Sequence, residues 1–503
     1  MPQYPDGTRI HQAEWNRLLE AIPASYTVWK DGTQAIAESN LNGGTDYTTG
    51  TDAAVFQNAV DALPVGGGKI VYRDKLIFTS PVTINKTGVH LSGENTAADL
   101  YFVRDGAYHG VSNKARGVII ADDIDAFQVG KDAFIQSFCL ENTVIHGKND
   151  DSALGEGIHS DGAGVRVFRG NMLHFKNVQV IGKEYGLHFA TEGGFAYDNV
   201  IDMVECDNIF LSFNQIGIYI AGGWFADSTF RNIYGYLNQK NLLKFTTLTY
   251  NIILDNIMSA LDNNGDVGVD DVPIYLAMGD INTLLAKDVS IQGTDSVNPL
   301  MRILIGKTWL KGARITFDNL VLYTCLTDST VAIGGDGDAT IIFNGLHGGI
   351  GGPAADPTLA GPIIHSGNVG DCRIYVDGGW LDCTVVDKKR WFYAAVAGQL
   401  EVHNVRGFNQ VGIVTNPFSE VLDAVGLYGD NAVPVANKTY TVNGFDCFIT
   451  SSGGTGVSIT IKNADGGTIA SGLGTLTAMF LSTGSKISFG NFTVDPTVVV
   501  SGV

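Results

Sequence analysis

The sequence is poor in charge, and basic residues are the scarcer sign. Asp, Glu, Lys and Arg make up 17% of the 503 residues, against about a quarter in typical domains. The 32 Lys and Arg face 52 Asp and Glu, which gives a formal net charge of −20. Binding to nucleic acid or to anionic membrane surfaces needs clustered cations, so this balance argues against both as partners.

Long apolar runs and paired cysteines are missing as well. No stretch approaches the about 18 apolar residues that cross a membrane. The start, MPQYPDGTRIHQAEW, lacks the basic and then apolar pattern of a secretory signal. The six cysteines, at 139, 206, 325, 372, 383 and 447, form no C-x-x-C pair. We therefore expect neither a zinc cage nor a disulfide framework, and mostly reduced core thiols.

Glycine is what the sequence has in excess. The 63 Gly are about one residue in eight, against about 7% in typical proteins, while 45% of the residues are hydrophobic. Many tight corners around a long apolar interior favour an all-β architecture over the string of three or four helical domains that the length alone would allow.

Helical periodicity appears only near the N-terminus. Residues 10–22, IHQAEWNRLLEAI, carry apolar residues at helical spacing before Pro23. So short a helix is marginal alone and must dock on its own domain, on sister chains or on a larger assembly. A second helix is predicted after the N-cap types Thr51 and Asp52. Its apolar face is Val55, Phe56, Ala59, Val60 and Leu63, and it stops at Pro64.

The block around the second helix resembles a known family. An acidic N-cap, an amphipathic helix, a Gly-rich turn and short strands (GGGKIVYRDKLIFTSPVTINKTGVHLSGE) follow one another over about residues 50–94. This order is similar to the start of the right-handed parallel β-helices of the pectate-lyase-like superfamily. The resemblance implies that the residues after it form coils of one solenoid.

Two repeated patterns support that expectation. The first is strand, Asn or Asp, strand, with intervals of 22 to 35 residues and a last interval of 60, two coils. Asn and Asp tolerate the left-handed conformation of a sharp corner and can hydrogen-bond between coils. The predicted corner residues are Asn142, Asn177, Asn199, Asn232, Asn256, Asp288, Asn319, Asn344 and Asn404.

The second pattern is a five-residue strand such as GVRVF, GLHFA or GIYIA, starting at 164, 186, 217, 242, 273, 300, 330 and 362. The average spacing is about 28 residues, within the range of solenoid repeats. Alternation along the strand points positions two and four inward. These are Val165 and Val167, Leu187 and Phe189, and Ile218 and Ile220.

The predicted fold is therefore all-β, a right-handed parallel β-helix between a short N-terminal helix and a C-terminal antiparallel β-sandwich. The expected parts are a docking helix (1–25), a capping helix with the first coils (26–94), the β-helix (95–424) and the sandwich (425–503). The last part has Gly-rich hairpin signals such as NADGG and STGS. It would close the solenoid, trimerise the chain or bind glycan.

Position three of the second pattern points outward and gives one row: Arg166, His188, Tyr219, Lys244, Tyr275 and Arg302. Small residues two positions later would leave the row as a groove. Cations and tyrosines suit a sugar polymer, because aromatic rings contact C–H faces and cations bind hydroxyls or carboxylates. The alternative is that the coils merely align ordinary surface residues.

Two reactions remain open for this surface. Hydrolysis needs two carboxylates, and Glu192 with Asp227 is the first choice, because Trp224 and Phe225 beside Asp227 could raise a carboxyl pKa and stack a sugar. Trp224 is accordingly counted with the substrate-binding row. Asp198, Asp202, Glu205 and Asp207 are further acids in the same region. β-Elimination would instead use His188, Tyr219 or Lys244 as base.

No cofactor or metal is expected. Asp262, Asn264, Asp266 and Asp270 have the spacing of a calcium loop, but Val267 stands at its Gly position and Pro273 at its terminal ligand. A structural calcium is therefore only weakly signalled. The acid-rich stretch 147–164 reads as a solvated loop.

The order of parts, without a secretory signal, resembles tail spikes of viruses that infect bacteria or archaea. The resemblance implies a homotrimer, assembled in the host cytoplasm and held in the virion tail or baseplate by the N-terminal helix. Its solenoid would bind, and in some members depolymerise, host surface polysaccharide. Two alternatives stay open: an extracellular polysaccharide lyase or glycoside hydrolase, and a non-enzymatic stalk or surface filament subunit.

Overall fold

The computed structural model describes residues 24–41, 43–94, 117–147, 160–190, 200–246, 249–260, 262, 271–279, 283–293, 299–307, 312–323, 331–350, 364–368, 370–383, 392–394, 399–409, 412–415, 438–441, 447–452, 458–462, 468–473, 476–481, 486–489 and 497–502. The chain divides into two compact units, residues 1–266 and 267–503. Each is described by itself. The predicted docking helix, 1–25, lies almost wholly outside the described residues.

The first unit begins with a hairpin and a capping helix. Strands β1 (Ala24–Asp31) and β2 (Gln34–Ser39) pair antiparallel, and helix α2 (Asp52–Ala62) follows. The hydroxyl of Thr51 accepts the N–H of Ala54 at 3.3 Å, as the N-cap prediction requires. On the buried face Phe56 meets the rings of Tyr72, Phe78 and Phe127 edge-on, with centroids 5.5 to 5.9 Å apart. The helix therefore covers the start of the core.

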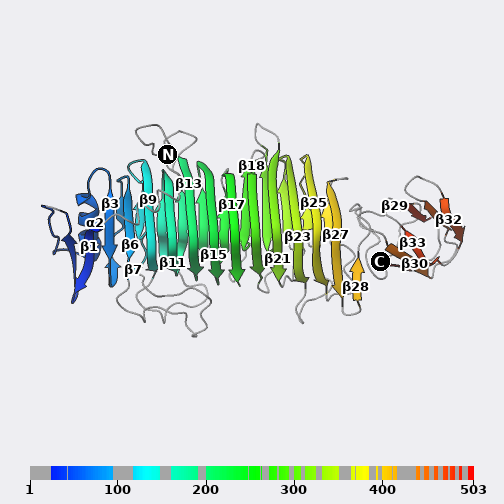
Figure 1. Ribbon diagram of the computed structural model, residues 1–503, viewed down its shortest axis with the longest axis horizontal. Coiled ribbons are helices and arrows are strands. Elements are labelled where there is room, and N and C mark those ends of the chain that lie inside the picture. Colours follow the sequence, from blue (N-terminus) through cyan, green and yellow to red (C-terminus); the bar gives the residue numbers. More distant parts are fainter. Residues whose placement is uncertain are drawn as a thin grey trace. The chain divides into compact units, whose positions relative to one another are not determined.

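The rest of the first unit is a stack of parallel coils (Figure 1). One set of strands pairs in parallel along one side, and its members are long from β9 onward: β3 (Gly68–Tyr72), β4 (Lys75–Phe78), β6 (Val89–Gly93), β7 (Gly117–Ala121), β9 (Ile135–His146), β11 (Gly170–Ile181), β13 (Val200–Ser212), β15 (Trp224–Tyr236) and β17 (Thr249–Ala260). A second set pairs in parallel along another side: β5 (Val82–Ile84), β8 (Phe127–Val129), β10 (Ser160–Val167), β12 (Lys183–Ala190), β14 (Ile216–Ala221) and β16 (Asn241–Phe245).

The second unit repeats the arrangement. One parallel set is β18 (Ile274–Gly279), β20 (Met301–Gly306), β22 (Val331–Gly335), β24 (Ile364–Ser366) and β26 (Phe392–Ala394). The other is β19 (Thr283–Gln292), β21 (Ala313–Tyr323), β23 (Ala339–Ile350), β25 (Cys372–Cys383) and β27 (Leu400–Asn409), with β28 (Gly412–Thr415) antiparallel to β27.

From residue 438 the strands are antiparallel. They form a four-stranded sheet in the order β29-β34-β31-β32 and a three-stranded sheet in the order β33-β30-β35. The bounds are β29 (Lys438–Thr441), β30 (Cys447–Ser452), β31 (Ser458–Lys462), β32 (Thr468–Leu473), β33 (Leu476–Leu481), β34 (Lys486–Phe489) and β35 (Thr497–Gly502). The packing of the two sheets into a sandwich stays a prediction.

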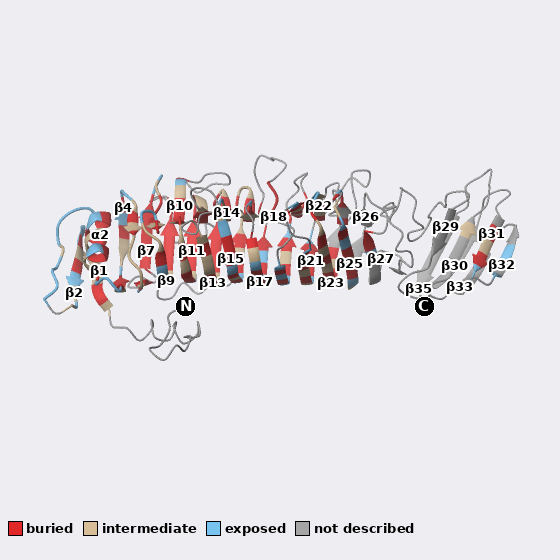
Figure 2. Cartoon of the chain, turned by 90° about the horizontal axis from the view of Figure 1, so that it is seen from above, coloured by how far each residue is buried: buried red, intermediate tan, exposed pale blue. Residues whose placement is uncertain are grey.

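The core of the coils consists mainly of buried apolar side chains, and Figure 2 shows buried residues along the strands of the coils. All six residues predicted to point inward, from Val165 to Ile220, are at most 1% exposed. Phenylalanine rings meet edge-to-face in the core: the centroid of Phe175 lies 5.9 Å from that of Phe138 and 5.8 Å from that of Phe189, which lies 5.4 Å from that of Phe225. The thiols of Cys206 and Cys372 are buried and not in disulfides. Within the described residues no helix is long and apolar enough to span a membrane.

A ladder of asparagines turns the long strands. Asn142, Asn177, Asn208, Asn232 and Asn256 all have φ between 51° and 56°, the left-handed region that Asn tolerates. Side-chain amides link the coils: Asn177 Nδ2 donates to Asn142 Oδ1 at 2.7 Å, and Asn208 Nδ2 to Asn177 Oδ1 at 3.1 Å.

Two predicted corners are corrected. In the coil after Asn177 the left-handed Asn is Asn208, which the sequence pattern did not select; the predicted corner Asn199 lies outside the described residues. In β23 the left-handed residue is Gly345, with φ of 72°, directly after Asn344. Asn344 instead donates to Asp318 on the preceding coil at 2.7 Å.

A second ladder is fully buried. Asn214, Asn238 and Asp262 have no exposed surface and stand 24 residues apart. Asn214 Nδ2 donates to Asn238 Oδ1 at 3.0 Å, and Asn238 Nδ2 donates to Asp262 Oδ1 at 2.8 Å. At the other end Asn214 Oδ1 accepts the N–H of Lys183, whose buried ammonium has four oxygen acceptors at 2.6 to 2.9 Å.

Candidate functional site

The strand pairing of β8, β10, β12, β14 and β16 creates the outward row that the repeat predicts. Gln128, Arg166, His188, Tyr219 and Lys244 are successive Cα partners on neighbouring strands. Adjacent parallel strands lie about 4.8 Å apart, so these side chains follow one another at that spacing. Arg166, Tyr219 and Lys244 are half-buried, neither lost in the core nor fully exposed.

His188 differs from its neighbours, and the expectation of an accessible base is wrong for it. Its side chain is only 6% exposed. The imidazole lies between the rings of Tyr185 and Tyr219, with centroid distances of 4.4 and 5.0 Å. Burial, together with the charge of Arg166, lowers the pKa of His188 to about 3. A group with such a pKa is neutral at pH 7 but too weak a base to remove a sugar proton.

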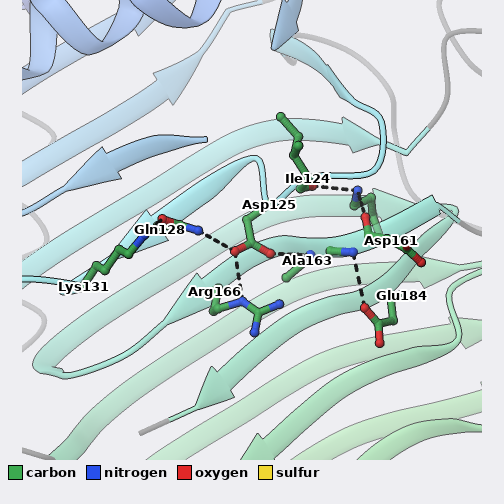
Figure 3. A network of polar contacts seen from close by, with 10 residues as sticks. Ile124, Asp125, Gln128, Lys131, Asp161, Ala163, Arg166 and Glu184 are labelled. Atoms are coloured by element: carbon green, nitrogen blue, oxygen red, sulfur yellow. Dashed lines mark hydrogen bonds and ion pairs between the residues drawn. The ribbon is translucent and has the colours of Figure 1, made fainter. Parts of the chain in front are cut away.

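Arg166 is held in place by Asp125 and by the ring of Tyr185. Its Nε donates to Asp125 Oδ2 at 3.0 Å, and its guanidinium carbon lies 6.0 Å from the centre of the Tyr185 ring. Asp125 also accepts from the N–H of Ala163 and from Gln128 Nε2, each at 2.8 Å. Figure 3 shows this network and the two terminal nitrogens of Arg166 on the far side from Asp125. The carboxylate thus fixes the orientation of the guanidinium.

The last two residues of the predicted row, Tyr275 and Arg302, belong to the second unit. Tyr275 and Arg302 are Cα partners on β18 and β20. Arg302 is half-buried, whereas Tyr275 is only 6% exposed. An exposed ring for stacking at Tyr275 was therefore a wrong expectation.

The acids lie differently from the sequence expectation. Glu192 falls outside the described residues. Asp227 is not in a turn after the outward row but inside β15, exposed, with φ of 47°. Its Oδ1 accepts from Asn251 Nδ2 of the next coil at 2.7 Å. The left-handed φ recurs at Met172, Met203 and Asn251 on the neighbouring long strands, so the whole row of strands bends here.

The structure pairs Asp227 with Asp202 of the preceding coil. Asp202 is a Cα partner of Ala226, the residue before Asp227. It is half-buried, and burial followed by the negative charge of Asp227 raises the pKa of its carboxyl. The N–H of Met203 donates to Asp202 Oδ1 at 2.8 Å and partly offsets this. A half-buried carboxyl with a raised pKa therefore stands near an exposed one.

An aromatic platform accompanies the two acids. Trp224, two residues before Ala226, is 39% exposed. Its ring stacks on that of Tyr250, with centroids 4.4 Å apart and an angle of 18° between planes. Tyr250 is the Cα partner of Ala226 from the next coil. Trp224, Tyr250, Asp202 and Asp227 thus occupy neighbouring positions on β13, β15 and β17.

Sequence reasoning included Asp202 among the acids but did not pair it. The signal that was available is the interval of 24 to 31 residues between coils, which places Asp202 beside Ala226 once Asn208 is taken as the corner. Tyr185 and Tyr250 were missed, because neither belongs to position three of the repeated strand.

The strand pairing defines the class of the protein: it is a right-handed parallel β-helix. Parallel strands joined by crossovers are almost always right-handed. No protein-family model matches the chain, and no curated protein matches it.

Several solved structures are similar to the chain at low identity. The tailspike protein of Acinetobacter baumannii phage AM24 is 10% identical, over 99% of this chain and 86% of that one, with a TM-score of 0.41. Tailspike protein 2 of Escherichia coli O157:H7 bacteriophage CAB120 is 11% identical, over 95% and 71%, with a TM-score of 0.43. The A-module of an Azotobacter vinelandii mannuronan C-5 epimerase is 12% identical, over 72% and 96%, with a TM-score of 0.36. The class assignment rests on the strand pairing and not on these likenesses.

Proposed function

We propose that the protein is a virion tail spike that binds host surface polysaccharide and hydrolyses it at Asp202 and Asp227. The observation that carries the hydrolytic part is the raised pKa of Asp202, half-buried beside Asp227 and next to the Trp224–Tyr250 stack. Polysaccharide is the substrate class because the outward row offers cations and a tyrosine at the regular spacing of the coils.

Binding would begin on the outward row. Arg166, oriented by Asp125, presents its terminal nitrogens to carboxylates or hydroxyls, and Lys244 adds a second cation two coils further on. Tyr219 between them gives a ring for the C–H face of a sugar. Substituting Tyr219 or Lys244 by Ala should weaken polysaccharide binding at least several-fold and leave the circular dichroism spectrum unchanged.

Hydrolysis divides between the two acids. Asp202 in its protonated form donates its proton to the glycosidic oxygen as the bond to the sugar breaks. The carboxylate form of Asp227 would either attack the anomeric carbon or remove a proton from the attacking water; the separation of the carboxyls with substrate bound decides which. Water adds across the bond, and one new reducing end appears for each bond cleaved.

Elimination is the weaker alternative. It needs a base strong enough to remove the proton beside a uronate carboxylate. His188 fails this test, because its pKa is about 3. Burial, and then Glu184, raises the pKa of Tyr185 above its ordinary value, so its phenol stays protonated.

The test is cleavage of a panel of bacterial and archaeal capsular and exopolysaccharides. We expect the wild-type chain to release reducing ends without the ultraviolet absorbance of unsaturated uronates. Asp202→Asn and Asp227→Asn should each lower the rate by at least about 100-fold. The matched control is Asp255→Asn, an acid of β17 in a surface ion pair with Arg231. Full activity in Asp202→Asn would refute the assignment, and unsaturated products would identify a lyase.

The tail-spike part has its own tests. A mass of about three times 53.6 kDa in solution would support the homotrimer, and a monomer would count against it. Deleting residues 1–25 should abolish attachment to particles and spare glycan activity, whereas a secreted enzyme would be indifferent to the deletion. A chain that neither binds nor cleaves any polysaccharide of the panel would favour the alternative of a non-enzymatic stalk.

A further inference from the structure

Three different metal-binding side chains meet on the outward face of β6 and β9. The ligand atoms of His90, Cys139 and Glu141 all lie within 4.8 Å of one another. His90 is only 1% exposed, and the other two are also buried or nearly so. This cluster is separate from Asp202 and Asp227 and takes no part in the hydrolysis proposed above.

The coil register explains why residues so far apart in sequence meet. The Cα of His90 pairs with that of Cys139, and the Cα of Ser92 pairs with that of Glu141. Cys139 and Glu141 are two residues apart on one strand and so share a face. The imidazole from one coil therefore faces a thiol and a carboxyl from the next.

The buried imidazole of His90 lacks a hydrogen-bond partner in this cluster. Among the described residues neither ring nitrogen makes a hydrogen bond of acceptable geometry, although Nε2 lies 3.0 Å from Glu141 Oε1. Leaving a buried polar atom without a partner is costly. A cation bound between the imidazole, the thiol and the carboxyl would satisfy it.

Glu141 is prepared to act as an anionic ligand. Ser92 Oγ donates to Glu141 Oε1 at 2.8 Å, and Lys69 Nζ lies 3.6 Å from the same oxygen. Such neighbours fix a ligand's orientation, as the outer groups of metal sites do.

We propose that His90, Cys139 and Glu141 bind one divalent cation of the zinc type. Imidazole, thiolate and carboxylate are the donors that zinc and cobalt accept, whereas calcium and magnesium take oxygen alone. Zinc bonds of about 2.0 to 2.3 Å hold ligand atoms about 3.3 to 3.8 Å apart, so the three ligand atoms need to approach one another by at most about 1.5 Å. Three protein ligands would leave the fourth tetrahedral position of such an ion to water.

Such an ion would add a metal link between coils that backbone hydrogen bonds and the contacts of Ser92 and Lys69 with Glu141 already join. Forty-nine residues separate His90 from Cys139 along the chain. Fixing this span ties the end of the capping region to the first long strand of the solenoid. The ion is thus a structural clip at the N-terminal coils, and its loss should lower the melting temperature.

Cobalt alone is the probe for the test. Purified full-length chain, first treated with a chelator, is titrated with Co²⁺ and followed by the charge-transfer absorbance of a cobalt–thiolate bond. We expect one Co²⁺ per chain, displacement by Zn²⁺, and a rise in melting temperature with either ion. Cys139→Ser should abolish the absorbance and the rise. Cys206→Ser, which changes a buried thiol that points into the core of β13, should keep both.

The outcomes separate cleanly. Glu141→Gln, which keeps the thiol and the imidazole, should weaken cobalt binding by at least about tenfold. A wild-type chain that shows no cobalt–thiolate absorbance at saturating Co²⁺ would overturn the proposal without reference to any variant. So would absorbance that persists in Cys139→Ser.

Discussion

Replacing Asp262 by Asn should stabilise the protein at neutral and alkaline pH. Asp262 stands where the buried ladder has Asn in the two preceding coils and has no exposed surface. Its Oδ1 accepts from the backbone and side-chain nitrogens of Asn238, both at 2.8 Å, and its Oδ2 accepts from Ser259 Oγ at 2.5 Å. An Asn keeps the same acceptor and directs its amide at Ser259, but carries no charge.

The magnitude follows from the pKa of Asp262. Burial raises it from 3.8 to about 7, although hydrogen bonds from Ser259 and Asn238 oppose the rise. At low pH the carboxyl is neutral in both the folded and the unfolded chain. As the pH rises from about 4 to 7 the unfolded chain loses this proton and the folded chain keeps it, so stability falls. Three units correspond to about 4 kcal/mol.

The assay is urea unfolding of the wild type and Asp262→Asn across this pH range, with hydrogen exchange of the amides of β15 and β17 as a local readout. We expect the variant to be more stable by about 4 kcal/mol at pH 8 and nearly unchanged at pH 4. Asp255→Asn, on the surface of β17, serves as the control and should change stability by less than about 1 kcal/mol at either pH. A variant that is no more stable than the wild type at pH 8 would refute the reasoning.

Three further results are expected. Asn238→Ala should cost about 3 to 5 kcal/mol of unfolding free energy, because several buried donors and acceptors lose their partner. Asn232→Ala on the exposed ladder should cost only about 1 kcal/mol. Denaturant unfolding measures both costs, and equal costs would contradict the role of burial. Phe189→Ala should cost about 3 to 5 kcal/mol by the same measurement, because it opens a cavity among the aromatic rings of the core. A loss of stability below about 1 kcal/mol would mean that the neighbouring side chains fill the cavity. Asp227→Asn should lower the pKa of Asp202, because a neighbouring negative charge is removed; carbon NMR titration of the carboxyl would show this, and an unchanged pKa would mean that the two acids do not interact.

The inward positions were readable from sequence because two simple periods coincide. Alternation within each strand, combined with the interval between strands, assigned residues such as Leu187 and Phe189 to the core without knowledge of any contact. The capping helix was equally accessible, since its N-cap, apolar face and terminating Pro64 are all local signals.

The predictions that were wrong or missing concerned residues whose positions depend on pairing between coils. The stretch YDNVIDMVECDNIF contains Asn199 and Asn208, and either fits a strand, Asn, strand pattern. Only the hydrogen bond of Asn208 to Asn177 decides between them. The approach of Asp202 to Asp227 likewise follows from left-handed residues such as Met203, and methionine gives no sequence signal for that conformation.

The sequence also did not show which side chains would be covered by neighbouring side chains. His188 occupies the outward position that its repeat predicts, yet Tyr185 three residues earlier folds against it. His90 and Cys139 belong to no common motif, and nothing along the chain shows that they become neighbours.

Two successive coils of the first unit have the same length in several independent rows. Asn214 with Asn238, Asn238 with Asp262, Asp227 with Asn251, and Asn232 with Asn256 are all hydrogen-bonded partners 24 residues apart. A gene segment of 24 codons is thus a natural unit of gain or loss here. Duplicating or excising it would lengthen or shorten the stack of coils in the first unit by about 4.8 Å while every remaining row kept its register. Evolution, or a designer, could set the reach of such a protein one coil at a time.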